Sequence, residues 1–323
     1  MLQLLALFIG IDVSKDTLDI AIFGPDGLLD TFKVSNDKKG FAQIHKRLSV
    51  KGAPESWHIN LEATSAYHRA FVLWMAELGV KVLVLNPKQA RDLAKGLGVL
   101  RKSDHTDAIV LGQCAKMAWR EPTALASGKP YELQEISRRI GVLTRMRASE
   151  RKRLLKPGAS EALVASLRRC IEFMTAELET LEAEWEALLA GCPEQGEIRK
   201  NILTVPGVGK ATARVVVSEL YATIGEHTSK QCVAYAGLAP QEQTSGTSLR
   251  RRGRLFSTGN KILRCALYMG AVSALRNDAE SRDLYGRLVA AGKHKKIGIV
   301  AVMNKMLRRI AAVAKRKSPW QKA

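Results

Sequence analysis

Short apolar runs separated by polar turns dominate the N-terminal part of the chain, up to Leu85. The run from Leu4 to Ile11 ends on a single carboxylate, Asp12, and residues 18–22 then alternate between apolar and polar side chains. This pattern predicts a buried strand, a tight turn and a half-buried partner strand. Similar reasoning predicts strands at 28–34, 56–61 and 80–85, and helices at 36–48, at 65–78 and from Ser103 onward.

The expected order is three strands in a meander, then helix, strand, helix, strand and helix. Such an order predicts a mixed α/β sheet with helices on both faces. It is also the order of ribonuclease H-like folds, in which the first strand lies centrally beside the fourth and a final helix runs past their ends. In that arrangement four acids would meet, namely Asp12, Glu62, Asp104 and Asp107.

These four acids predict a metal site. Asp12 and Glu62 each lie at the end of a predicted strand, while Asp104 and Asp107 lie three residues apart on one helical face. Converging carboxylates repel one another unless divalent cations neutralise them. Oxygen ligands without histidine or cysteine favour Mg²⁺ or Mn²⁺. Asp12 taken alone is equally well explained as the first residue of a turn, so the hypothesis depends on the ordered set.

From Tyr131 the apolar residues recur at three- and four-residue steps. Lys156-Pro157-Gly158 interrupts this spacing, which resumes from Leu163 and continues to Leu188. Sustained over this length, the spacing predicts a coiled-coil seam that ends at Gly191. We expect the two helices to form an antiparallel hairpin or a dimerisation arm, and we do not expect catalysis there.

A glycine-containing turn between two short helices follows at residues 198–220. Its residues Gly207, Gly209 and Lys210 resemble a helix-hairpin-helix DNA-binding element, whose free backbone N–H groups and helix N-terminus can hold a phosphate. An ordinary helix–helix turn is the alternative. The turn lacks the spacing of an ATP-binding loop.

A Ser-Gly-Thr-Ser loop begins at Ser245 and is followed by a basic cluster. Arginine side chains next to such a loop can hold DNA phosphates by bidentate contacts, and a serine hydroxyl can be placed against the phosphate. A solvated basic loop is the alternative. After Asp283 there is no acidic residue, and we expect a basic helix at 297–314 that lies on nucleic acid. The expected contacts of the loop come from Arg250, Arg251, Arg252, Arg254 and Lys261.

Composition supports a polyanionic partner. The 323 residues include 51 Lys and Arg against 31 Asp and Glu, a net charge of +20 that favours nucleic acid. A membrane is not expected, because the N-terminal apolar run is too short to span and no basic residue precedes it. The five cysteines are scattered and form no zinc or disulfide pattern, which favours a reducing, cytoplasmic and nucleoid-associated location. We expect three parts: residues 1–125, a linker at 126–195, and 196–323.

Six motifs, taken in order, resemble the insertion-sequence-110 family of transposases, relatives of the Piv and MooV site-specific recombinases. The resemblance extends over essentially the whole chain. The motifs are Ile9–Asp12, Leu61–Thr64, Asn86-Pro87, Lys102–Ala108, Val205–Gly209, and Ala236–Pro240 with the following Ser245-Gly246.

This resemblance implies a RuvC-like ribonuclease H fold, a helical coiled-coil linker and a mostly helical C-terminal transposase domain. It places an Asp-Glu-Asp-Asp metal tetrad on the four acids named above, and a nucleophilic serine on Ser245. It also implies a bridge RNA that pairs with donor and target DNA. The family's composite sites further imply a homo-oligomer, a dimer or tetramer, in which the tetrad and the serine meet across a subunit interface.

The expected function is therefore Mg²⁺-dependent cleavage and rejoining of DNA through a phosphoserine intermediate. A hydrolytic RuvC-like endonuclease, such as a Holliday-junction resolvase, would use the same acids but would leave Ser245 without a role. A sugar kinase or actin-like ATPase would need a second glycine-rich phosphate loop, which the sequence lacks. A non-catalytic nucleic-acid scaffold would not need four convergent acids.

Overall fold

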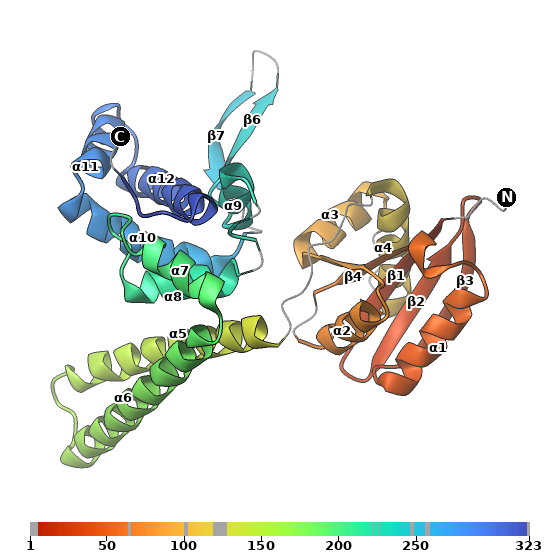
Figure 1. Ribbon diagram of the computed structural model, residues 1–323, viewed down its shortest axis with the longest axis horizontal. Helices are drawn as coiled ribbons and strands as arrows, with labels where there is room; N and C mark the ends of the chain where they lie inside the picture. Colours follow the sequence, from red (N-terminus) through yellow and green to blue (C-terminus); the bar gives the residue numbers. More distant parts are fainter. Residues whose placement is uncertain are drawn as a thin grey trace. The chain divides into compact units, whose positions relative to one another are not determined.

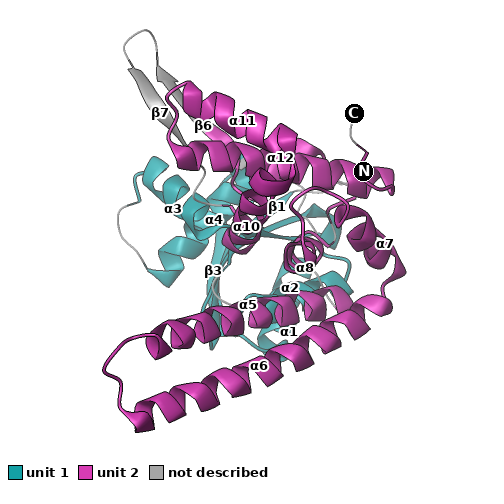
Figure 2. Cartoon of the chain, turned by 90° about the vertical axis from the view of Figure 1, so that its left-hand side faces the viewer, with its two compact units in different colours: residues 1–125 teal, residues 126–323 magenta. Residues whose placement is uncertain are grey.

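The computed structural model describes residues 6–63, 66–99, 103–118, 128–221, 223–225, 227–245, 249–255 and 259–321. For residues 241–245 and 249–255 it describes the backbone alone. The chain forms two compact units, Met1–Leu125 and Ala126–Ala323, which Figure 2 shows in different colours. Each unit has a hydrophobic core of its own, so each is described separately.

The first unit is built on a five-stranded mixed sheet (Figure 1). Its strands lie in the order β3-β2-β1-β4-β5, where β2 is antiparallel to both β1 and β3, and β4 is parallel to both β1 and β5. The predicted central position of the first strand beside the fourth is therefore confirmed. The strands are β1 (Leu7–Val13), β2 (Thr17–Phe23), β3 (Leu28–Ser35), β4 (Trp57–Glu62) and β5 (Val82–Leu85).

Helices cover both faces of this sheet. Alternate residues of a strand point to opposite sides, and here both sides carry apolar side chains that the helices bury. Ile9 and Ile11 of β1 pack with Phe41 of α1 and Phe71 of α2 on one face. On the other face β1 contacts α4, while Leu85 of β5 packs in a cluster with residues of α3 and α4. The helices are α1 (Lys38–Ser49), α2 (Arg69–Glu77), α3 (Pro87–Gly96) and α4 (Asp104–Ala118), with a short 3₁₀ turn at Pro54–Ser56.

The second unit begins with the long antiparallel hairpin of α5 (Lys129–Leu154) and α6 (Glu161–Ala190) (Figure 1). Ser160 caps α6 by accepting a hydrogen bond from the backbone N–H of Leu163, and the helix ends at Ala190 as predicted. The seam of this hairpin, including the almost fully buried Trp185, belongs to the same hydrophobic cluster as the C-terminal helices. The division of this unit into a linker and a C-terminal domain stays a prediction.

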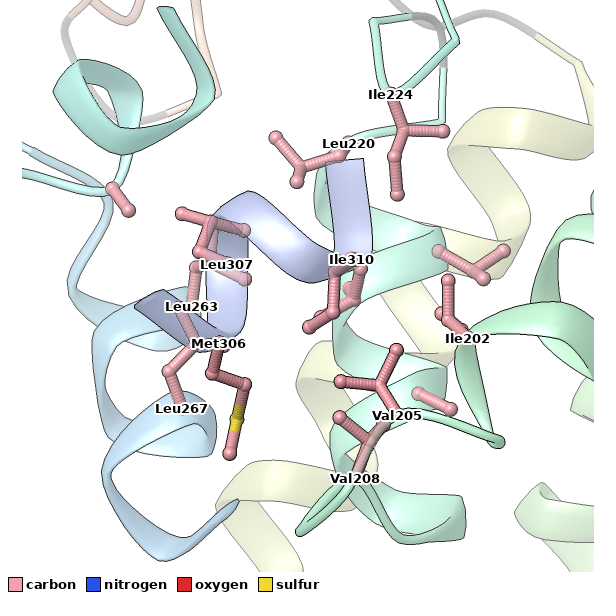
Figure 3. Close-up of a cluster of buried hydrophobic side chains, with 14 of the residues drawn as sticks. Ile202, Val205, Val208, Leu220, Ile224, Leu263, Leu267, Met306, Leu307 and Ile310 are labelled. Atoms are coloured by element: carbon pink, nitrogen blue, oxygen red, sulfur yellow. The ribbon is translucent and has the colours of Figure 1, made fainter. Parts of the chain in front are cut away.

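The remaining elements of the second unit pack around the cluster that Figure 3 shows, to which Ile202, Leu263 and Ile310 contribute from three different helices. The elements are α7 (Pro193–Ile202), α8 (Lys210–Glu219), α9 (Ser229–Tyr235), β6 (Pro240–Ser245), β7 (Leu249–Leu255), α10 (Lys261–Asn277), α11 (Ala279–Ala290) and α12 (Lys295–Arg316). A two-stranded antiparallel sheet, which the sequence did not predict, lies between α9 and α10 in the chain.

The predicted helix at 297–314 lies within α12, and its expected contact with nucleic acid stays a prediction. Met306, Leu307 and Ile310 on this helix are buried in the centre of the unit. Its Arg309 is only 6% exposed and pairs with Asp278 at 2.8 Å as well as with a glutamate of α11. The helix is therefore a core element, and part of its positive charge is neutralised within the protein. No helix in the described ranges is long and apolar enough to cross a bilayer.

Candidate functional site

The parallel pairing of β1 with β4 brings Asp12 and Glu62 to the same edge of the sheet. Ile11 is in register with Leu61, so the acid that follows each of them lies at the carboxyl end of two neighbouring strands. The rings of Phe8 and His58, earlier in the same two strands, stack with centroids 5.2 Å apart. Even-numbered residues of both strands thus share one face, and this is the face that α4 covers.

Two glycines allow the backbone of α4 to touch the sheet. A Cβ on Gly10 would overlap the carbonyl oxygen of Ala108 and the backbone nitrogen of Gly112, and a Cβ on Gly112 would lie 2.7 Å from the ring of Phe23. Because α4 crosses β1 at this contact, its first turn reaches toward the end of β1 where Asp12 lies. These glycines were not among the residues singled out from the sequence, although an isolated glycine in a buried strand is a known sign of close backbone approach.

The first turn of α4 carries Asp104, which is exposed, and Asp107, which is half-buried. The hydroxyl of Ser103 accepts a hydrogen bond from the N–H of Thr106 at 3.2 Å, as expected of a residue that begins a helix. The positive end of the helix dipole also favours acids in this turn.

Electrostatics indicate that the charges of the other three acids reach Asp12. The pKa of Asp12 is raised from 3.8 to about 6, mainly by burial and then by the negative charges of Asp104, Asp107, Glu62 and Asp19. Since these interactions decay with distance, all four predicted acids belong to one electrostatic cluster. We call Asp12, Glu62, Asp104 and Asp107 the acid cluster.

Two residues that were not predicted from the sequence extend the acid cluster across the sheet. Asp19 of β2 lies directly opposite Asp12, and Lys33 of β3 lies opposite Asp19. The Nζ of Lys33 is 3.0 Å from a carboxylate oxygen of Asp19, and this hydrogen bond raises the pKa of Lys33. Strand register alone brings them together, and register was not part of the sequence prediction.

The donors of the acid cluster suit a hard divalent cation, because all of them are carboxylate oxygens. A cation there would also relieve the repulsion on Asp12. Among the residues with described positions, however, no three acids, histidines or cysteines are already arranged to hold a metal ion. Beneath the acid cluster, the fully buried Asn60 has an amide whose nitrogen and oxygen find no hydrogen-bond partner in the described structure. The carboxylate oxygens therefore fit a cation site whose side chains rearrange as the ion binds, and the Asn60 amide could gain a hydrogen-bond partner in that rearrangement.

In the second unit, Ser245 is the last residue of β6. The register of the β6–β7 hairpin places it opposite Leu249, and places Thr244 and Gln243 opposite Arg250 and Arg251. The basic cluster therefore lies on the strand paired with the one that ends at Ser245. Gly246 and Ser248 of the predicted loop, like Lys102 and Thr64 of the motifs, lie outside the described residues.

Comparison with known proteins decides the family. Residues 9–156 match the DEDD transposase domain of IS110 elements, and residues 199–286 match the family described as "Transposase IS116/IS110/IS902 family". The pilin gene-inverting proteins of Moraxella lacunata and Moraxella bovis are each 30% identical over 326 residues, which is 98% of this chain and 98% of theirs. The chain belongs to the IS110 family of transposases. The transposase for insertion sequence element IS1111A of Coxiella burnetii is a more distant relative, 23% identical over 94% of this chain and 92% of its own.

In this IS110-family transposase, a second pair of glycines closes the base of the β6–β7 hairpin. Gly237, before β6, has a positive φ of 69°, and a Cβ on Gly259, after β7, would overlap its backbone. The N–H of Asn260 also donates to the carbonyl of Tyr235 at 2.8 Å, and a guanidinium N–H of Arg264 donates to the carbonyl of Ala236 at 3.0 Å. The two ends of the hairpin are thus held together by backbone contacts.

A buried carboxylate that was not predicted from the sequence connects this base to the coiled-coil hairpin. The side chain of Glu219 is fully buried and receives two hydrogen bonds from Arg138 of α5, at 2.7 and 2.9 Å. It receives a third from the amide of Asn260 at 2.7 Å and a fourth from Gln134 at 3.3 Å. The hydrogen bond to Glu219 raises the pKa of Arg138. Four donors satisfy the buried charge, as such a charge requires.

The helix-hairpin-helix-like turn of the transposase is only partly open to a ligand. Gly207 has a φ of 86°, and a Cβ on it would lie 2.5 Å from the carbonyl oxygen of Gly270 in α10. This glycine is therefore required by packing. Gly209, which caps α8, and Lys210, its first residue, are exposed, as is Lys261 at the start of α10. These exposed positions remain candidates for phosphate contacts.

Proposed function

We propose that this transposase cuts and rejoins DNA through a covalent phosphoserine intermediate, with Ser245 as the nucleophile and a divalent cation, Mg²⁺ or Mn²⁺, held by the acid cluster. The observation that carries the proposal is the environment of Asp12, whose pKa is raised first by burial and then by the charges of Asp104, Asp107 and Glu62. The strand order, with an antiparallel meander joined to two parallel strands and α4 across β1, supports a RuvC-like ribonuclease H fold for this unit.

The nucleophile and the phosphate contacts come from the second unit. The Oγ of Ser245 attacks the scissile phosphorus, and the new O–P bond forms as the bond to the leaving deoxyribose oxygen breaks. The hydroxyl proton is lost to water, and the leaving oxygen takes up a proton. Arginines 250, 251, 252 and 254 neutralise the charge on the phosphate. Rejoining reverses these steps, because the phosphoserine bond conserves the energy of the broken bond.

The acid cluster contributes through the ion that it binds. A bound divalent cation would polarise the phosphate and stabilise negative charge on the leaving oxygen. Asp12 and Glu62 present their carboxylates from rigid strand ends, and Asp104 and Asp107 present theirs from the first turn of a helix. These elements fix the backbone positions of the ligands, so only their side chains need to rearrange around the ion.

The partners of the proposed reaction are donor and target DNA, a bridge RNA, and further copies of this chain in a dimer or tetramer. The net charge of +20 supports polyanionic partners. The names of the relatives, a pilin gene-inverting protein and a transposase, describe proteins that rearrange DNA. The bridge RNA and the oligomer rest on the family resemblance of the motifs.

The test is a search for a covalent protein–DNA adduct. Purified protein with its co-purified RNA is incubated with labelled DNA and Mg²⁺, and denaturing gels separate free DNA from DNA attached to protein. We expect an adduct with the wild type and none with Ser245→Ala or with Asp12→Asn. Ser248→Ala is the matched control and should retain the adduct, because only one hydroxyl can lie in line with the leaving oxygen.

The same experiment distinguishes the hydrolytic endonuclease. An enzyme that uses activated water would cut DNA normally as Ser245→Ala and would never form an adduct. Wild-type cleavage by that variant would therefore refute the phosphoserine mechanism while leaving the acid cluster as the catalytic site.

A further inference from the structure

Asn60 in the centre of β4 is the least satisfied polar side chain of the first unit's core. Its exposed fraction is 0%, and within the described structure neither Nδ2 nor Oδ1 has a hydrogen-bond partner. A buried amide without partners lowers the stability of a protein, and such groups are rare in native structures unless they have a function.

The position of Asn60 relates it to the acid cluster. It is in register with Gly10 of β1, and it lies two residues before Glu62 and therefore on the same face of the sheet. That face is the one on which Phe8 stacks with His58 and on which α4 packs. One step of roughly 6.6 Å along the strand separates two residues on the same face, so the acid cluster is the next layer above the amide.

Few other hydrogen-bond partners for the Asn60 amide lie at its level of the sheet. Gly10 has no side chain, and the residues of α4 that meet it, Ala108 and Gly112, have no side-chain donor or acceptor. The backbone groups of β1, β4 and α4 are used in the sheet ladder and in the helix. One step along the strands on this face, the groups that can accept a hydrogen bond from Nδ2 are the imidazole of His58 on one side and the carboxylates of Asp12 and Glu62 on the other. A carboxylate is the stronger acceptor, because its negative charge strengthens the hydrogen bond.

We propose that Asn60 is a positioning residue of the acid cluster, whose Nδ2–H donates to a carboxylate of the strand-end pair Asp12 and Glu62 when a divalent cation draws the acids together. The bond orients that carboxylate toward the ion and gives the buried amide a partner. This inference rests on the cation site of the proposed function. Residues that orient metal ligands in this way commonly change metal affinity 10- to 100-fold when they are replaced.

The test compares Asn60→Leu with wild type in two measurements that do not depend on activity. The first is the melting temperature without DNA in EDTA. The second is the Mn²⁺ concentration that gives half of the maximal increase in melting temperature, with the metal alone as probe. We expect Asn60→Leu to melt at the same temperature as wild type or roughly 2–4 °C higher, because an unsatisfied amide has been removed. We expect its Mn²⁺ midpoint to rise 10- to 100-fold.

Two further variants make the result decisive. Asn60→Ser restores a small hydrogen-bond donor and should return the Mn²⁺ midpoint to within several-fold of wild type; it also serves if Asn60→Leu fails to fold. Ile59→Val, on the same strand but on the opposite face, is the matched control and should lower the melting temperature without moving the midpoint.

Each remaining outcome overturns the inference. A Mn²⁺ midpoint in Asn60→Leu equal to that of wild type would show that the amide does not act on the acid cluster. A midpoint in Asn60→Ser as poor as that in Asn60→Leu would show that the donor is not what matters. A wild-type protein that Mn²⁺ does not stabilise at all would instead refute the cation site itself, so failure of the inference and failure of the proposed function are distinguishable.

Discussion

Replacing Asp12 by asparagine should make the metal-free protein more stable at neutral pH while abolishing DNA cleavage. In the folded protein the pKa of Asp12 is raised from 3.8 to about 6 by burial and by the other acids of the cluster. At pH 8 the folded protein must therefore hold a carboxylate in a place that disfavours its charge. Asparagine has nearly the same shape and no charge, so it removes this penalty.

The magnitude follows from the pKa. A rise from 3.8 to about 6, at about 1.36 kcal/mol for each pH unit, corresponds to about 3 kcal/mol of lost stability at high pH. Asp12 is only half-buried, and solvent screens part of the effect, so we expect a gain on the order of 1–2 kcal/mol for Asp12→Asn. The pKa of Asp12 is higher in the folded than in the unfolded protein, so the folded state binds this proton more tightly. The wild type is therefore not destabilised by Asp12 below pH 3.8, becomes less stable as the pH rises from 3.8 to about 6, and stays at the lower stability above that pH.

Hydrogen–deuterium exchange of the β1 and β4 amides, measured in EDTA between pH 5 and 8, reports the stability of this unit alone. The difference between Asp12→Asn and wild type should grow up to about pH 6 to 7 and then stay constant. Asp26→Asn, at an exposed turn of the same unit, is the matched control and should show no such growth. Saturating Mg²⁺ should stabilise the wild type and reduce the difference. An Asp12→Asn protein that is no more stable than wild type at pH 8 would refute this reasoning.

Three further changes have defined outcomes. Gly10→Ala should lower the free energy of unfolding of the first unit by about 1–3 kcal/mol in urea titrations, because its Cβ would push α4 off the sheet; unchanged stability would show that the helix can shift freely. Glu219→Gln should lower the free energy of unfolding by about 2–3 kcal/mol in thermal melts of the second unit, and Gln134→Ala should lower it less, since Gln134 supplies only the longest of the four hydrogen bonds, at 3.3 Å; the opposite ranking would contradict the network. Replacing Arg250 and Arg252 by glutamine should make the slope of log affinity against log salt shallower, by about 0.9 for each phosphate of duplex DNA that the protein no longer neutralises. Filter-binding titrations measure this slope, and an unchanged slope would mean that these side chains are solvated.

Much of the first unit could be predicted from the sequence, because its signals are local. The apolar run around Ile9 is continuous, apolar and polar residues alternate around Ile59, and four apolar residues follow one another from Val82, so each stretch indicates a strand without reference to any partner. Asp12 and Glu62 each lie at the end of such a stretch, and chain order then suggests that they meet. The seam of α5 and α6 was equally readable, since its three- and four-residue spacing repeats over many turns.

The second unit shows where local signals fail. The β6–β7 hairpin went unpredicted because its strands, rich in glutamine and arginine, lack the apolar alternation that marks a half-buried strand. The excess of basic residues in α12 does not reveal that one of them, Arg309, pairs with Asp278, 31 residues earlier. Pairing of that kind depends on how α11 and α12 fold together.

What the sequence determined by itself is therefore the strand order along the first unit, the coiled-coil hairpin, the acids at strand ends and the serine before the glycine, because each depends on residues that are close along the chain. Only the tertiary structure decided which residues support them. Gly10 meets Gly112 from a distant part of the chain, Glu219 meets Arg138, and the amide of Asn60 beneath the acid cluster has no hydrogen-bond partner among the described residues. Register, burial and close backbone approach arise between distant segments, and no local pattern of side chains specifies them.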